Sequence, residues 1–106
     1  MRSDILKNHL ELLVLGALSG GPGHGYSIIR EIRDRSGGEL EVLEGSLYPA
    51  LHRLERIGFV TSGWSEVGGR KRRVYKLTRK GKTAFAAQAR EWRRFQRAVN
   101  LVLAPR

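Results

Sequence analysis

Cysteine is absent from this chain of 106 residues, which excludes disulfides, thiolate metal sites and thiol catalysis. Long apolar runs are absent too. The longest, from Leu12 to Leu18, has seven residues, whereas a membrane-spanning helix needs about 18. The first residues do not lead into a signal peptide with a small-residue cleavage site. We therefore expect one domain in the cytoplasm, without membrane contact.

Acidic side chains are scarce in the C-terminal part. Residues 1–40 carry five basic and five acidic side chains, and residues 41–66 carry two basic and four acidic ones. Residues 67–106 carry thirteen basic side chains and a single acidic one, Glu91, which gives a net charge of +12. Such asymmetry is typical of a protein that binds a polyanion, most often nucleic acid. A merely solubilising surface would spread the charge more evenly.

The N-terminal part predicts two helices. Residues 4–19 are apolar at nearly every position after Glu11, a stretch too long for a strand, and this predicts the central buried helix. Glycine and proline in residues 20–23 end it. Residues 24–35 place isoleucines on one side and charges mostly on the other, which predicts an amphipathic helix with Tyr26 packed in the core. His24, at its start, is expected to cap this helix or to pack, with contact to the DNA backbone as the alternative.

A third helix is predicted after residues 40–43, whose alternating leucine and glutamate suggest a short strand. The helix begins at Gly45 and Ser46, with Ser46 as its cap and Pro49 in the first turn, where the missing N–H of proline does no harm. Gly58 ends it. Its apolar stripe faces the core and comprises Leu47, Ala50, Leu51, Leu54 and Ile57. The outer side presents Tyr48, Pro49, His52, Arg53 and Arg56.

Two strands and a long helix complete the chain. Residues 59–66 and 72–78 are rich in aromatic and β-branched side chains, which predicts a hairpin with a basic, glycine-containing tip over residues 67–71. Thr78 starts a last helix, over residues 79–103. Apolar residues recur there at heptad spacing, which predicts a seam of Phe85, Ala89, Trp92, Phe95 and Val99. The arginines of this helix are expected to form a solvated outer face.

Three helices followed by a hairpin form a winged helix, an elaborated helix-turn-helix. The predicted fold class is therefore mainly α with a small β-hairpin. It consists of a winged helix-turn-helix DNA-binding domain over residues 1–78 and a long C-terminal dimerisation helix over residues 79–106, in one compact unit. In that fold the third helix enters the major groove of DNA, and the hairpin, or wing, lies along the adjacent backbone.

Hydroxyl, imidazole and guanidinium groups can reach base edges or phosphates. The candidate DNA-binding residues on the third helix are therefore Ser46, Tyr48, Pro49, His52 and Arg53. The basic side chains of the wing suit phosphate or minor-groove contact, and they are Arg70, Lys71, Arg72 and Arg73. The alternatives stay open: the helix residues also suit a packed helix start and a solvated face, and Arg56 suits an ion pair as well as DNA.

The seam of the last helix has two interpretations. The plain one is the core of a homodimer, in which Trp92 and Phe95 pack against a second copy together with the other three residues. The sharper hypothesis gives Trp92 and Phe95 a further role. In it, the aromatic side chains of two protomers line a cavity at the dimer interface that accepts a small, flat aromatic effector.

No motif predicts an enzyme. Gly81-Lys82-Thr83 ends like a phosphate-binding loop, but Lys76 occupies the position of the leading glycine. His9, His24 and His52 fall on different predicted elements, so neither a zinc site nor a catalytic triad is indicated. We expect no catalytic residue, no metal and no cofactor.

Three segments carry a family resemblance: His24-Gly25-Tyr26, residues 45–55 (GSLYPALHRLE) and residues 69–81 (GRKRRVYKLTRKG). They are similar to the PadR family of winged-helix transcriptional regulators, over most of the chain and most specifically in the second segment. The resemblance implies a homodimeric repressor, usually bacterial, whose C-terminal helix pairs two winged helices on a palindromic operator. Ligand-responsive members of the family suggest the aromatic effector. The chain resembles the compact branch, and Lys71 stands where the family commonly has proline.

The sequence therefore favours a dimeric repressor that binds double-stranded DNA. A small basic RNA-binding protein is one alternative, but sequence-specific RNA modules usually display an aromatic stacking platform on a sheet. Trp64 and Tyr75 are too few for that and are expected too near the core. A winged helix that contacts only other proteins is the second alternative. It would not need a net charge of +12 in its C-terminal part.

Overall fold

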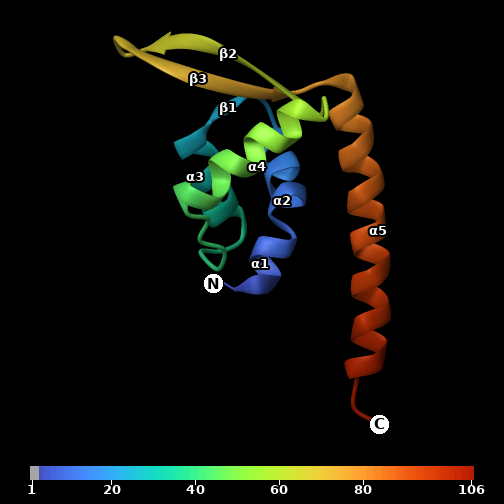
Figure 1. Cartoon of the computed structure of the whole chain (residues 1–106). Coiled ribbons are helices and arrows are strands. Elements are labelled where there is room, and N and C mark those ends of the chain that lie inside the picture. The colour runs from blue at the N-terminus through green and yellow to red at the C-terminus, as the bar shows by residue number, and fades with distance from the viewer. Residues whose placement is uncertain (1–2) are drawn as a thin grey trace.

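The computed structural model describes residues 3–106, and at Val67 the backbone alone. The elements follow the order α1 (Asp4–Asn8), α2 (Leu10–Leu18), β1 (Gly23–His24), α3 (Gly25–Arg35), α4 (Glu44–Arg56), β2 (Val60–Val67), β3 (Arg70–Leu77) and α5 (Arg79–Leu103). A body of short helices carries a small sheet at one end, and α5 runs along the body and extends past it (Figure 1). The predicted class, mainly α with a hairpin and a long C-terminal helix, is confirmed.

The core gathers around α2, which packs against α3, α4 and α5. Val14 and Leu15 of α2 are fully buried, as are Leu47 and Leu51 of α4. Burying one such side chain contributes about 1.5–3 kcal/mol, so these contacts hold the helices together. The prediction of a central buried helix is confirmed for α2.

The predicted helix over residues 4–19 is not continuous, because it breaks at His9. The backbone of His9 has φ −116° and ψ 10°, outside the helical region. Its N–H donates to the Leu6 carbonyl at 3.2 Å, and its Nδ1 lies 2.8 Å from the Ile5 carbonyl oxygen. A side chain that bonds a carbonyl of the preceding turn competes with the helical ladder. α1 and α2 are therefore separate helices that meet at His9.

Tyr26 does not pack in the core, which corrects the prediction. Ile28 and Ile32 are the isoleucines that α3 buries, and this turns Tyr26 outward, where it is 54% exposed. The guanidinium carbon of Arg30 lies 5.3 Å from its ring centre, since residues four apart meet on a helix surface. His24 occupies the N-cap position of α3. Its backbone N–H donates to Ser27 Oγ at 3.0 Å, and its carbonyl accepts from the same hydroxyl at 2.9 Å, so capping by the His24 side chain stays a prediction.

Residues 40–43 form no strand, contrary to the prediction. Val42 is buried in the core and Leu40 packs against the same cluster. The Leu40 N–H donates to the Ser36 side chain at 3.0 Å, not to a neighbouring strand. The alternation of apolar and acidic residues therefore marks a loop with a buried side.

α4 begins earlier than predicted and without a side-chain cap. Its N-cap is Leu43, whose carbonyl accepts the N–H groups of Ser46 and Leu47, each at 3.0 Å. Ser46 is therefore a first-turn residue and not the cap, and Pro49 lies inside the helix, beyond its first turn. The backbone of a loop residue thus starts the helix, which a search for a polar cap could not show.

The sheet contains three antiparallel strands in the order β1-β3-β2. β1 pairs Gly23 with Tyr75 and His24 with Val74, and the sequence analysis did not predict this strand. It is only two residues long, too short for any alternation to be visible. β1 ties the base of the wing to the start of α3.

The wing is a tighter hairpin than predicted. Gly68 and Gly69 have φ +60° and +76°, the values that a two-residue type I′ turn requires. Val67 pairs with Arg70 directly beside the turn. Arg70 and Lys71 therefore belong to β3, and not to a loop over residues 67–71.

α5 is attached to the body at its first turn. Thr78 is its N-cap: Oγ1 accepts the Gly81 N–H at 3.0 Å and donates to the Gly58 carbonyl at 2.6 Å. Gly81 lies so close to Phe59 that a Cβ there would overlap the Phe59 carbonyl oxygen. These contacts fix α5 to the turn that follows α4. The predicted bounds of 79–103 are confirmed.

Candidate nucleic-acid interface

α4 turns one side to the core and the other to solvent. At 100° per residue, the buried Leu51 and Leu54 leave the opposite side to an exposed set: Gly45, Pro49, His52 and Arg56. Two predicted DNA-binding residues, Pro49 and His52, thus lie at the centre of the open face. Arg56 lies there too, and it forms no ion pair with any residue between 3 and 106.

Tyr48 lies at one edge of this face, against the start of α3. A Cβ at Gly25 would overlap the Tyr48 hydroxyl and lie 2.7 Å from its Cζ, so only glycine leaves room for the ring. Tyr48 nevertheless stays 38% exposed. Packing and contact with DNA are therefore compatible for Tyr48, and the contact stays a prediction. The glycine of the segment His24-Gly25-Tyr26 is explained by this packing.

Ser46 and Arg53 lie on the other flank of α4, towards α2. They are seven residues apart and so share one side of the helix. Arg53 forms an ion pair with Glu11 of α2, and Ser46 is half-buried. Contact of these two residues with DNA stays a prediction. The Arg53 side chain is 60% exposed and a guanidinium has five N–H donors, so Arg53 can keep Glu11 and still offer donors to a phosphate.

The four basic residues of the wing do not share one face. Successive residues of a strand point to opposite sides, so Arg73 shares its side with the buried Tyr75, whereas Arg70 and Arg72 lie on the other side. Arg70 and Lys71, next to the turn, are exposed, and Arg72 is half-buried. The predicted basic cluster is therefore two sets of side chains on two faces of the hairpin.

Arg73 is held by its own chain. Its Nε donates to Ser62 Oγ at 3.0 Å, and its guanidinium carbon lies 5.3 Å from the centre of the Trp64 ring. Ser62 Oγ in turn donates to Glu55 Oε2 of α4 at 2.6 Å. Sequence analysis did not select Glu55 or Ser62. It expected Trp64 near the core, which is wrong, since Trp64 is 68% exposed, whereas Tyr75 is buried as expected. The register of the hairpin, which pairs Trp64 with Arg73, is the signal that could have indicated part of this cluster.

Two titratable groups at the base of the wing have shifted pKa values. Burial lowers the pKa of His24 below 6.5, and the positive charges of Arg72 and Arg30 lower it further. Burial raises the pKa of Tyr75 above 10.0, against the opposing effect of Arg73. Both groups are therefore neutral at pH 7, so the positive potential of this region comes from its arginines and lysines.

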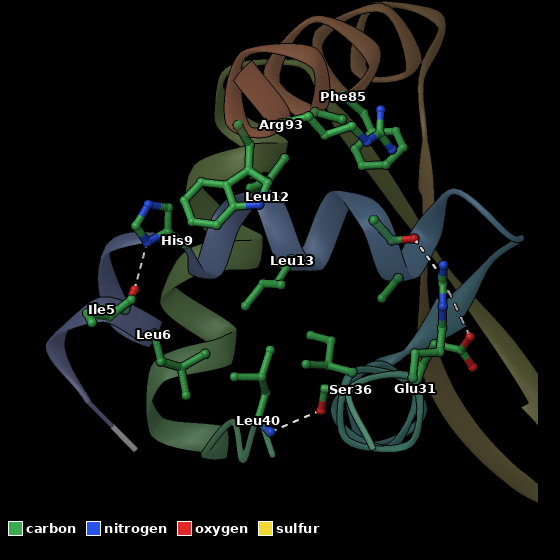
Figure 2. A pocket seen from close by; sticks show the side chains of 16 residues that line it. Ile5, Leu6, His9, Leu12, Leu13, Glu31, Ser36, Leu40, Phe85 and Arg93 are labelled. Carbon is green, nitrogen blue, oxygen red and sulfur yellow. Dashed lines mark hydrogen bonds and ion pairs between the residues drawn. The ribbon is translucent and has the colours of Figure 1, made fainter. Parts of the chain in front are cut away.

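A second surface of the molecule is apolar. A groove of about 490 Å³ lies between α1, α2, α3 and α5. Phe85 and Arg93 reach it from α5, Leu12 and Leu13 from α2, and Leu6 from α1 (Figure 2). The groove is open to solvent on the side away from the core, so it is a surface on which an apolar group can lie.

The structure divides the predicted seam of α5. Three of its members line the apolar groove of their own chain: Phe85, Ala89 and Trp92. The Trp92 ring also meets His9 edge-on, with centroids 4.8 Å apart. Phe95 is 58% exposed and lines a separate, more polar groove, and Val99 lines neither. Their place in a dimer interface or an effector pocket stays a prediction.

Over residues 3–106, none of the helices combines the length and the apolar character that crossing a bilayer requires. The same residues contain no group of three or more histidine, aspartate or glutamate side chains that could hold a metal ion.

Comparison with known proteins identifies the family to which this architecture belongs. The model of the Transcriptional regulator PadR-like family matches residues 14–87. The transcriptional regulator Rv3488 of Mycobacterium tuberculosis is 40% identical over 76 residues, a match that covers 72% of this chain and 68% of that protein. The resemblance inferred from the three sequence segments is therefore confirmed.

Solved structures share the fold. A transcriptional regulator from Clostridium thermocellum superposes with a TM-score of 0.86 at 26% identity, over 98% of this chain and 99% of that one. Bacillus subtilis PadR, solved in complex with operator DNA, superposes with a TM-score of 0.68 at 27% identity, over 76% of this chain and 46% of that one. The family consists of regulators of transcription and not of enzymes. The chain described here belongs to the PadR-like family of transcriptional regulators.

Proposed function

We propose that this chain is a sequence-specific DNA-binding regulator that acts as a dimeric repressor on a palindromic operator. The observation that carries this proposal is the open face of α4, with His52 and Arg56 at its centre, beside a hairpin whose exposed end carries Arg70 and Lys71. The likeness to Bacillus subtilis PadR, which was solved with operator DNA, supports the same class of partner here. Such a regulator would act in the cytoplasm.

α4 is the element that we assign to the major groove, which is about 12 Å wide and admits one helix. His52 and Arg56 would then face base edges, where imidazole and guanidinium groups can bond purine acceptors. Tyr48 and Ser46 would reach the flanking phosphates with their hydroxyls. Pro49 shapes the same face without donating a hydrogen bond.

The wing supplies the contacts that do not depend on sequence. Arg70, Lys71 and Arg72 suit phosphates, because each cation that neutralises a phosphate releases condensed counterions. The tight turn of Gly68 and Gly69 allows the backbone to approach the duplex closely. The wing therefore fixes the register of α4 on the duplex.

Two uncovered apolar surfaces on the same chain support a dimer. One is the groove between α1, α2, α3 and α5. The other is the far end of α5, where Leu101, Val102 and Leu103 are exposed. A two-fold dimer can bury both at once, since each copy offers both surfaces. We assign residues 1–78 to DNA binding and residues 79–106 to this pairing, with half-sites about 34 Å apart.

An aromatic effector would act through the groove. Trp92 and Phe85 line it, and stacking on an indole favours flat rings. α5 is attached through Thr78 and Gly81 to the end of α4, so a change in how α5 packs would move α4 in the dimer. The effector can release DNA only if it binds the two arrangements with different affinity.

Binding to DNA upstream of the chain's own gene tests the proposal. Fluorescence anisotropy would follow the complex across salt concentrations, with random-sequence DNA as competitor. Specific binding that survives competitor at about 0.15 M salt, with a steep salt dependence, is expected. Arg56→Ala should reduce it about tenfold or more, and Arg97→Ala, an exposed arginine on α5, is the matched control.

The other possible outcomes of this binding experiment favour a different binding site or a different function. Binding that competitor removes completely would mean that the operator lies at another gene, or that the basic face serves another polyanion such as RNA. Absence of binding at any salt concentration would overturn the proposal and favour a protein-contact module. For the effector, a compound that quenches the fluorescence of Trp92 without changing operator affinity would contradict the proposed coupling between the groove and DNA binding.

A further inference from the structure

Three polar side chains connect α4 to the wing: Glu55, Ser62 and Arg73, here called the brace. Ser62 Oγ donates to Glu55 Oε2 at 2.6 Å and accepts from Arg73 Nε at 3.0 Å. One hydroxyl thus uses its donor and acceptor capacity together. Both bonds involve a charged partner, and such bonds are about twice as strong as neutral ones. Glu55 and Ser62 are half-buried, so solvent weakens the bond between them less than it would at an open surface. Arg73 is exposed, and its bond to Ser62 is open to solvent.

Trp64 supports Arg73 from a second direction. It is the direct cross-strand partner of Arg73, and the guanidinium carbon lies 5.3 Å from its ring centre. A planar guanidinium over an aromatic ring is attracted to it electrostatically. The hydrogen bond to Ser62 and the ring of Trp64 together determine where the Arg73 guanidinium points. Arg73 is therefore committed to contacts within its own chain.

The brace is the last attachment of the wing to the body. From Ser62 and Arg73 towards the turn, the described side chains are all exposed except Arg72, which is half-buried. The β2–β3 ladder holds the two strands to each other, but it does not set the angle between the hairpin and α4. β1 and the core hold the base of the hairpin at Val74 and Tyr75. One position nearer the turn, Arg73 is connected through Ser62 to Glu55 of α4, so this contact is placed to influence the angle between the hairpin and α4.

We propose that the brace positions the wing relative to α4, so that Arg70 and its neighbours reach the DNA backbone while α4 occupies the groove. In this proposal Glu55, Ser62 and Arg73 are positioning residues, and Arg73 does not itself neutralise a phosphate. The inference rests on the proposed function, because it assigns roles within the same DNA-binding face.

Ser62→Ala is the decisive variant, because it breaks the brace without changing any charge. Its binding to a 30-base-pair duplex of random sequence would be measured across salt, since phosphate contacts do not depend on sequence. Loss of one or two phosphate contacts at the wing should lower the salt slope by about one to two units. We expect an affinity about tenfold lower at moderate salt. Ser65→Ala, on the same strand but exposed, is the matched control and should leave the slope unchanged.

A second substitution separates positioning from general damage. Arg70→Ala should lower the slope by about one unit in the parent chain, and by clearly less in the Ser62→Ala background, because the unbraced wing no longer places Arg70 at a phosphate. Ser62→Thr keeps the hydroxyl and should restore the slope. Thermal melting of each variant checks that the fold is retained. If Ser62→Ala fails to fold, Glu55→Ala breaks the same contact from the α4 side.

The outcomes are distinguishable. A parent chain that binds the duplex with a steep slope, and a folded Ser62→Ala variant with the same slope, would overturn the brace and leave the proposed function intact. Fully additive effects of Ser62→Ala and Arg70→Ala would also overturn it. A parent chain that does not bind DNA would overturn the proposed function and the brace together.

Discussion

The two open surfaces of this molecule differ in chemistry. The face formed by α4 and the wing carries arginines, lysines and an imidazole, whereas the groove and the far end of α5 carry leucines, valine and aromatic rings. Charged groups are stable in contact with water, so the first face can remain open until DNA arrives. Apolar surface is not stable in contact with water. We therefore propose that the apolar surface pairs with a second copy of the chain before the charged face binds DNA.

The largest expected effect concerns the apolar surface. Leu101→Asp with Leu103→Asp places two charges at exposed apolar positions of α5 and should weaken dimerisation about a hundredfold or more, since each lost apolar contact is worth about 1.5–3 kcal/mol. Sedimentation velocity across protein concentrations measures this. Thr83→Asp, an exposed polar position near the other end of the same helix, is the control. A double variant that dimerises like the parent would show that the apolar end of α5 is not an interface.

The next effect concerns the connection between the two surfaces. Gly81→Ala places a Cβ against the Phe59 carbonyl oxygen, and backbone cannot move aside as a side chain can. We expect the free energy of unfolding to fall by about 2–3 kcal/mol. Urea denaturation measures it, and Gly63→Ala, with open space around its Cβ position, is the matched control. If both variants are equally stable, the close contact between α5 and Phe59 is wrong.

A smaller effect tests whether Tyr48 belongs to the DNA-binding face. Gly25→Ala pushes against the end of the Tyr48 side chain, which can swing away. Operator affinity should therefore fall about tenfold while the free energy of unfolding changes by less than about 1 kcal/mol. Gly20→Ala, in the turn after α2, where a Cβ meets no atom within 4 Å, is the matched control and should keep the operator affinity. Equal affinity for Gly25→Ala and the parent would remove Tyr48 from the interface.

The smallest effect is a pH dependence. Folding lowers the pKa of His24 below 6.5, so at mildly acidic pH the unfolded chain binds more protons than the folded one. This contribution to stability is complete above the unfolded pKa and is lost as the pH falls towards the folded pKa. His24→Asn should therefore lose less stability than the parent between about pH 7.5 and 5.5. Urea denaturation at the two pH values checks this. An identical loss in both proteins would contradict the assignment to His24.

Much of the fold could be predicted because local patterns agree with the tertiary structure. The heptad spacing of α5 and its Thr78 cap are local features, and the bounds of this helix were predicted from them. The buried stripe of α4, with Leu47 and Leu51, is equally local. The break at His9 could not be predicted, because the apolar pattern continues across it. β1 has too few residues to show a pattern.

The candidate site was harder to predict, because its contacts join residues far apart in the sequence. Arg53 meets Glu11 of another helix, and nothing near Arg53 in the sequence indicates that partner. Arg73 appears within a basic run, and only the hairpin register and the position of Ser62 show that it faces the body. Composition thus located the cationic region, while the tertiary structure decides which cations are available to DNA.

The central claim is that one face binds DNA while the other binds a second copy of the chain. Sedimentation of the protein with a fluorescent duplex that carries the operator bound by this chain tests both parts in one measurement. Two chains per duplex are predicted for the parent, and Leu101→Asp with Leu103→Asp should bind far more weakly because each half-site must then be occupied separately. A single chain per duplex, with an affinity that the α5 substitutions leave unchanged, would contradict the account.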